Sequence, residues 1–137
     1  MSDRNKRAIT FTLGLLAIGF GVMTLKSGGF ALFGGVEGKE FAGQYVPFVL
    51  WFNFIAGFFY VISGGGIIFK TKWALKLSIA LAALTLLVFL GFGIHIFLGN
   101  SYETRTIGAM SIRAIFWIII SASLMKFEPN KKQSITL

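Results

Sequence analysis

The sequence predicts an all-α integral membrane protein, a four-helix bundle with both termini in the cytoplasm. Two observations lead to this class. Of the 137 residues, 55% are hydrophobic and only 13% are charged, with a mean hydropathy of +0.79, whereas a soluble domain needs far more surface charge. The hydrophobic residues also gather in long runs, and the runs 47–69 and 77–98 contain no Asp, Glu, Lys or Arg. About 20 apolar residues in a helix span the roughly 30 Å hydrocarbon core of a bilayer.

The first helix is expected over residues 8–25, after a polar and basic N-terminal segment. This run is longer than the roughly 7–15 apolar residues of a signal peptide and no A-x-A-like cleavage site follows it, so we expect it to be retained. Ala17 and Gly21 form a small-xxx-small pair, and Gly14 and Gly19 add points where another helix can approach closely. The alternative is that glycine is simply common in membrane helices.

Residues 27–45 are rich in glycine and aromatic residues. We expect a loop at the membrane interface, because backbone broken by glycine would leave polar groups unpaired in hydrocarbon. Pro47 then suits the first turn of the second helix, 47–69, where its missing N–H costs no hydrogen bond. Three consecutive glycines, 64–66, indicate a kink or a tight crossing in this helix.

The third helix, 77–98, follows a short basic turn and carries Thr85 and His95. At a rise of about 1.5 Å per residue, Thr85 reaches nearly the same depth as Tyr60 of the second helix. A hydrogen bond between Tyr60 and Thr85 is therefore one expectation. The other is that each hydroxyl bonds the backbone of its own helix.

The fourth helix, 107–125, spans the bilayer only if Arg113 is accepted about 9 Å inside its start. An arginine there raises the free energy of inserting the helix into the membrane by at most about 2.5–3.5 kcal/mol. The cost is lower when the residue lies off-centre and its side chain snorkels to the interface. The whole chain, 1–137, is thus expected to form a single transmembrane domain.

The positive-inside rule gives the orientation of this bundle. In a four-helix topology one side holds most of the basic residues, and three glutamates offset the few on the other side. An odd number of spans would place one basic terminus outside, so the charge pattern independently supports the fourth helix. We expect a bacterial inner-membrane protein whose basic side faces the cytoplasm, a side that holds Arg4, Lys6, Arg7, Lys70, Lys72, Lys76, Lys126, Lys131 and Lys132.

Polar residues from three helices are predicted to meet in the outer leaflet. Asn53, His95 and Arg113 reach comparable depths, and Tyr102 and Glu103 lie on the loop above them. Ionisable residues within spans are costly and mark a functional site by default. Such a group could transfer protons or bind an anionic or quinone head group, because histidine titrates at about pH 6.5 and arginine offers a fixed donor fork. The structural alternative is that Arg113 pairs with Glu103 while His95 snorkels to the interface.

Several classes are disfavoured by what the sequence lacks. With no cysteine and one histidine, it predicts no disulfide, thiol relay or zinc site. No catalytic residue is assigned, and the one cofactor that the polar group would suit is a quinone. The basic residues lie in short clusters between apolar runs, so nucleic acid is not an expected partner. The expected partners are the lipid bilayer and either another membrane protein or a second copy of this chain.

The order of these features resembles the DoxX-like family of small four-helix membrane proteins. The similar features are Gly19, Gly21 and Lys26 at the end of the first helix, Asn53, Ala56-Gly57 and Ser63-Gly64 in the second, and His95 and Tyr102-Glu103 before the fourth. Family members often carry a carboxylate where Asn53 stands, and Arg113 has no counterpart that we can match.

Some members are subunits of membrane redox complexes such as thiosulfate:quinone oxidoreductase. The resemblance therefore implies a non-catalytic or accessory subunit whose small-residue faces pack against a partner. The alternative function is a small-ligand or quinone-handling protein that uses the outer-leaflet polar group.

Overall fold

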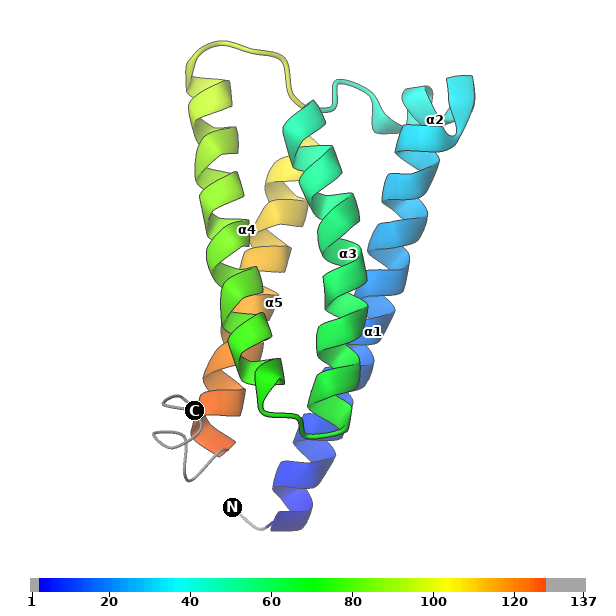
Figure 1. Ribbon diagram of the computed structural model, residues 1–137. Helices are drawn as coiled ribbons and strands as arrows, with labels where there is room; N and C mark the ends of the chain where they lie inside the picture. The colour runs from blue at the N-terminus through cyan, green and yellow to red at the C-terminus, as the bar shows by residue number, and fades with distance from the viewer. Residues whose placement is uncertain (1–2, 128–137) are drawn as a thin grey trace.

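The computed structural model describes residues 3–127 and shows a bundle of helices (Figure 1). The elements are α1 (Asp3–Phe33), α2 (Gly35–Ala42), α3 (Pro47–Ile68), α4 (Trp73–Phe97) and α5 (Thr104–Phe127). Four of them, α1, α3, α4 and α5, are long and apolar enough to cross a membrane. The predicted class, an all-α membrane protein with four spanning helices, is confirmed.

The four long helices stand side by side in the order α1, α3, α4, α5 (Figure 1). Each of the three larger interfaces joins two long helices that follow one another along the chain. The contact between α1 and α5 is the slightest of the four, and we call it the α1–α5 seam. Each of the other pairs is joined by a short connection, which for α1 and α3 includes α2, whereas no connection joins α1 directly to α5.

The interface between α1 and α3 brings backbone against backbone. A Cβ atom built on Gly21 would lie 2.8 Å from the carbonyl oxygen of Gly57, and one built on Gly64 would lie 2.7 Å from that of Gly14. Ala17, between the two α1 glycines, has no exposed surface. The helices can approach this closely because these positions carry little or no side chain.

Other glycines of these helices serve different contacts or none. Gly66 faces α4, where a Cβ would lie 2.6 Å from the ring of Trp73. Gly19 and Gly65 face outward, since a Cβ on either would meet nothing within 4 Å among the described residues. The structure thus assigns tight crossings to Gly14, Gly21, Gly64 and Gly66 but not to Gly19.

The prediction of a loop over residues 27–45 is wrong for most of this segment. Residues 27–33 extend α1, and 35–42 form the short helix α2. Gly28 packs on α3, where a Cβ would lie 3.1 Å from the ring of Phe54. The chain leaves helical geometry at Gly35 and Gly43, whose positive φ values of 67° and 63° favour glycine. Pro47 begins α3 as expected.

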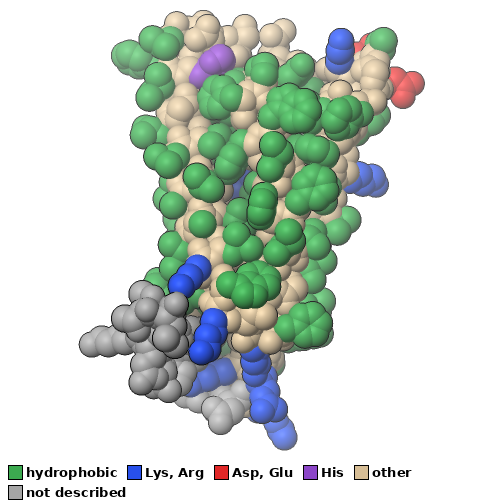
Figure 2. All heavy atoms as spheres, viewed as in Figure 1, with side chains coloured by type: hydrophobic (Ala, Val, Ile, Leu, Met, Phe, Trp, Pro, Cys, Tyr) green, Lys and Arg blue, Asp and Glu red, His purple; other side chains and the backbone are tan. Residues whose placement is uncertain are grey.

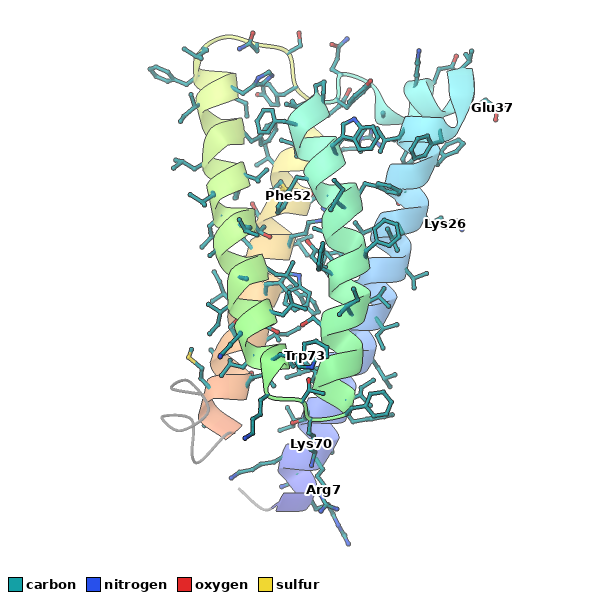
Figure 3. The ribbon with its side chains drawn as sticks, viewed as in Figure 1. Arg7, Lys26, Glu37, Phe52, Lys70 and Trp73 are labelled. Atoms are coloured by element: carbon teal, nitrogen blue, oxygen red, sulfur yellow. The ribbon has the colours of Figure 1, made fainter. Side chains whose placement is uncertain are left out.

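The two ends of the bundle differ in charge. Basic side chains gather at the end where α1 begins and α5 ends (Figure 2), and Arg7 and Lys70 lie there in Figure 3. The opposite end carries α2 and the α4–α5 connection, and we call it the loop end. Glu37 lies at the loop end, on α2 (Figure 3).

The larger hydrophobic core fills the basic half and centres on Tyr60 and Trp117, which have no exposed surface. A smaller apolar cluster near the loop end includes Val49, Phe92 and Met110. Apart from these two clusters, a space with some polar side chains in its wall remains between α1, α3 and α5.

Candidate functional site

A cavity of about 170 Å³ occupies this space in the loop-end half. Side chains from α1, α3 and α5 form its walls, and α2 with the adjoining loops closes it toward the loop end. Its polar lining includes Thr24, Asn53, Glu103, Arg105 and Arg113. The cavity therefore joins polar groups from three separate segments of the chain, α1, α3 and α5 with the residue before it.

Arg113 is the most buried charged group of this cavity. It lies nine residues inside α5, about 14 Å from the helix start at the usual rise per residue. Its Nη2 donates to the Thr24 hydroxyl at 3.4 Å, a long bond, and the guanidinium carbon lies 5.4 Å from the ring centroid of Phe20. Its Nε is buried without a hydrogen-bond partner among the described residues. Arg113 therefore keeps donor capacity that the protein leaves unused.

The expected ion pair between Arg113 and Glu103 is not formed between these two described residues. Both line the cavity, but Glu103 Oε1 accepts a hydrogen bond of 2.6 Å from the backbone N–H of Gln44. Glu103 lies just before α5, so its carboxylate reaches the α2–α3 connection instead of the deeper guanidinium. The Glu103 carboxylate holds the loop end of the cavity together, and the guanidinium of Arg113 is left without an acidic partner among the described residues.

His95 and Tyr102 are not among the residues that line the cavity. The ring Nε2 of His95 donates to the carbonyl oxygen of Ser101 at 3.0 Å, and Phe48 lies edge-on beside the imidazole. The ring of Tyr102 packs against Phe92 of α4, with 6.1 Å between centroids. The structure therefore brings together three of the five predicted site residues, and the single histidine lies elsewhere.

Thr24, Ser27 and Arg105 line the cavity although sequence reasoning did not select them. Thr24 and Ser27 are three residues apart on one helix, which places both on one face. That spacing was a signal in the sequence. Arg105 donates to the carbonyl oxygen of Phe41 at 2.7 Å, and its guanidinium lies 5.6 Å from the centre of the Phe41 ring. Nothing in the sequence connects these two residues.

Buried polar groups continue below the cavity. The hydroxyl of Tyr60 lies among the side chains of Thr85, Trp117 and Arg113. Within residues 3–127, this hydroxyl, the Thr85 oxygen and the Trp117 Nε1 make no hydrogen bond of full geometry, but the Tyr60 hydroxyl lies within interaction range of Thr85. Tyr60 and Thr85 are therefore neighbours, and the hydrogen bond between them stays a prediction.

The wall of the cavity is mostly apolar, and the few charged groups in it are mainly hydrogen-bond donors. Two arginines face it, against one glutamate that is already bonded to a backbone N–H. Within residues 3–127 no three His, Asp or Glu side chains are placed to hold a metal ion. Comparison of the chain with family models, with curated proteins and with solved structures finds no match.

Proposed function

We propose that this membrane protein binds the polar head of an amphiphilic molecule in the cavity, with Arg113 as the principal donor. The observation that carries the proposal is the buried guanidinium, which has unused donor capacity and no acidic partner among the described residues. A charge buried within a span is costly and usually marks a site. An anionic or carbonyl-bearing head group would accept the free N–H bonds of Arg113.

The size of the cavity limits what it can hold. Pockets for whole drug-sized ligands measure about 300–1,000 Å³, and this one measures about 170 Å³. The cavity suits a head group, and the tail of the amphiphile would remain in the surrounding membrane. This is the small-ligand or quinone-handling function that the sequence left open.

The accessory-subunit function suggested by the DoxX-like resemblance receives less support. It depends on small-residue faces that pack against a partner, and Gly14 and Gly21 are used in the contact between α1 and α3. Membership of that family, a bacterial inner-membrane location and cytoplasmic termini all stay predictions.

A binding titration in detergent tests the proposed function. Two probes, dioctanoyl phosphatidic acid and decylubiquinone, carry an anionic and a quinone head. We expect saturable binding of at least one probe, and Arg113→Gln should weaken it about tenfold or more, because a charge-assisted hydrogen bond contributes about 1.5–3 kcal/mol. The affinity of Arg113→Lys should lie between those of the unmodified protein and Arg113→Gln, because lysine keeps the charge but lacks the planar fork of donors.

The matched control is Arg7→Gln, the same change at an exposed position at the basic end of α1. It should bind as the unmodified protein does. Absence of saturable binding of both probes, or equal affinities of Arg113→Gln and Arg7→Gln, would contradict the proposed function.

A further inference from the structure

A second hollow adjoins the cavity at the α1–α5 seam. This hollow, of about 220 Å³, lies between Phe20 and Met23 of α1 and Ile112 of α5. It shares Thr24, Ser27, Ala109 and Arg113 with the cavity. The guanidinium of Arg113 therefore borders both spaces, and the cavity adjoins the outer face of the bundle at this point.

A third hollow, of about 340 Å³, extends this opening along α1 toward the loop end. It shares Met23 and Ser27 with the second hollow and also contacts Lys26, Phe30 and Phe41. We call the second and third hollows together the seam groove. Much of the groove wall is apolar and exposed, for example Met23 at 69% and Phe30 at 41%.

The position of the seam groove follows from the way the bundle closes. The seam is the interface with the slightest contact, and no loop joins its two helices. At the junction of groove and cavity the α5 wall is formed by Ala109, whose side chain is a single methyl group, and by Arg113, whose long hydrogen bond to Thr24 crosses the seam. The small side chains of Ala109 and Ser27 and the loose interface mark the place beside Arg113 where a chain of methylene groups would pass.

The charges along this path favour an anion over a neutral head group. Arg105 and Arg113 face the cavity, the carboxylate of Glu103 is bonded to the Gln44 N–H, and Lys26 lies exposed at the groove rim (Figure 3). Two opposite unit charges in contact attract each other more strongly than a charge and a neutral carbonyl dipole do. Arg113 can present two parallel N–H groups to the oxygens of a phosphate.

We propose that the ligand is a phosphate-headed lipid that reaches the cavity sideways from the membrane through the α1–α5 seam. Its phosphate binds Arg113, and its acyl chains lie in the seam groove against Phe20, Met23 and Ile112. This inference rests on the proposed function and adds two statements to it, the class of the head group and the route. Each statement has a test of its own.

Three probes test the head group: dioctanoyl phosphatidic acid, dioctanoylglycerol and inorganic phosphate. The first two share their chains and differ by the phosphate. We expect dioctanoyl phosphatidic acid to bind at least tenfold more tightly than either of the other probes. Tighter binding of inorganic phosphate would identify a soluble anion as the ligand and overturn the proposal.

A different result would separate this inference from the proposed function. If decylubiquinone binds in an Arg113-dependent manner and dioctanoyl phosphatidic acid does not, the cavity binds amphiphiles but the phosphate-headed class is wrong. If neither probe binds, the proposed function itself fails.

Two substitutions test the route by filling the junction from opposite sides, Ala109→Phe on α5 and Ser27→Phe on α1. Gly108→Phe is the control, because a Cβ at Gly108 meets nothing within 4 Å of it in the part of the chain that is described. We expect both junction variants to bind dioctanoyl phosphatidic acid at least tenfold more weakly than the unmodified protein does. The control should bind it with unchanged affinity.

Thermal unfolding in detergent identifies any variant that fails to fold. Ser27 is exposed, so at least the α1 variant should keep its melting temperature. Unchanged affinity in a folded junction variant would overturn the lateral route.

Discussion

The carboxylate of Glu103 closes the loop end of the cavity instead of neutralising Arg113. Its hydrogen bond to the Gln44 N–H joins two connections that lie 59 residues apart in the chain. Arg105 makes a second link of this kind to the Phe41 carbonyl. Together these bonds keep α2 against the start of α5, and the inner arginine stays available to a ligand.

Glu103→Ala should therefore lower the melting temperature in detergent. The lost bond has a charged acceptor but is partly exposed, so we expect a cost of about 1 kcal/mol. Glu40→Ala, on the exposed surface of α2, should leave the melting temperature unchanged. In a double-mutant cycle the effects of Glu103→Ala and Arg113→Ala should add, because the two side chains have separate partners. A coupling of 1 kcal/mol or more would show that they pair.

The buried hydroxyls of Ser63 and Ser78 share a hydrogen bond of 3.1 Å between α3 and α4. Ser63→Ala should destabilise the protein by about 1 kcal/mol, because the Ser78 hydroxyl is then left buried and unpaired. Changing both serines to alanine should cost less than the sum of the two single changes. Urea or detergent unfolding followed by circular dichroism measures all three variants, and strictly additive losses would show that the bond contributes nothing.

The sequence identified Arg113 and Asn53 as site residues because a polar group inside a span is costly wherever it points, and Glu103 because it lies on the loop above them. It placed His95 with them on depth alone. The rise per residue fixes the depth of a side chain, but its direction around the helix axis depends on how the helix packs. His95 turns toward Phe48 and Ser101, and this direction could not be obtained from the spacing.

Among the helices, α1 departs furthest from its expected bounds. The glycines after Ser27 suggested a loop, yet the helix continues to Phe33. Within a membrane a helix satisfies all its own backbone groups, so glycine does not break it as readily as in water. The role of Gly28 lies in its contact with Phe54, and a contact between distant segments has no local signature in one sequence. The start of α3 at Pro47 was predictable from local chemistry, whereas α4 begins at Trp73 instead of residue 77 and α5 at Thr104 instead of residue 107.

A pair of glycine substitutions on α1 tests the close contact with α3. Gly21→Ala should destabilise the protein by about 1–3 kcal/mol, because the new methyl would lie 2.8 Å from a carbonyl oxygen of α3. Gly19→Ala should be neutral or stabilising by up to about 1 kcal/mol, because its position is open and alanine favours the helix. The measurement is thermal unfolding in one detergent. Equal melting temperatures for the two variants would contradict the close contact between α1 and α3 at Gly21.

For the molecule as a whole, length and hydropathy predicted three spans, and the fourth was predicted only with the help of the charge pattern; the structure has four helices long and apolar enough to span. The orientation of these spans stays a prediction, and the basic end described above gives its test. Reporter fusions after Lys76 and at the C-terminus should both read cytoplasmic, whereas a fusion in the α4–α5 connection should read periplasmic. A periplasmic signal from the C-terminal fusion would reverse the orientation of α5 and contradict the four-span topology.

The pairing of neighbours along the chain bears on how this protein is made. All residues of the tightest contact, α1 against α3, precede residue 69, so this pair can form as soon as α3 has emerged from the ribosome, while the rest of the chain is still being synthesised. A nascent chain that stops in the 69–72 turn should already hold a paired hairpin in the bilayer. Accordingly, two separately encoded halves, divided within that turn, should reassemble when they are expressed together, and co-purification through a tag on one half would reveal it.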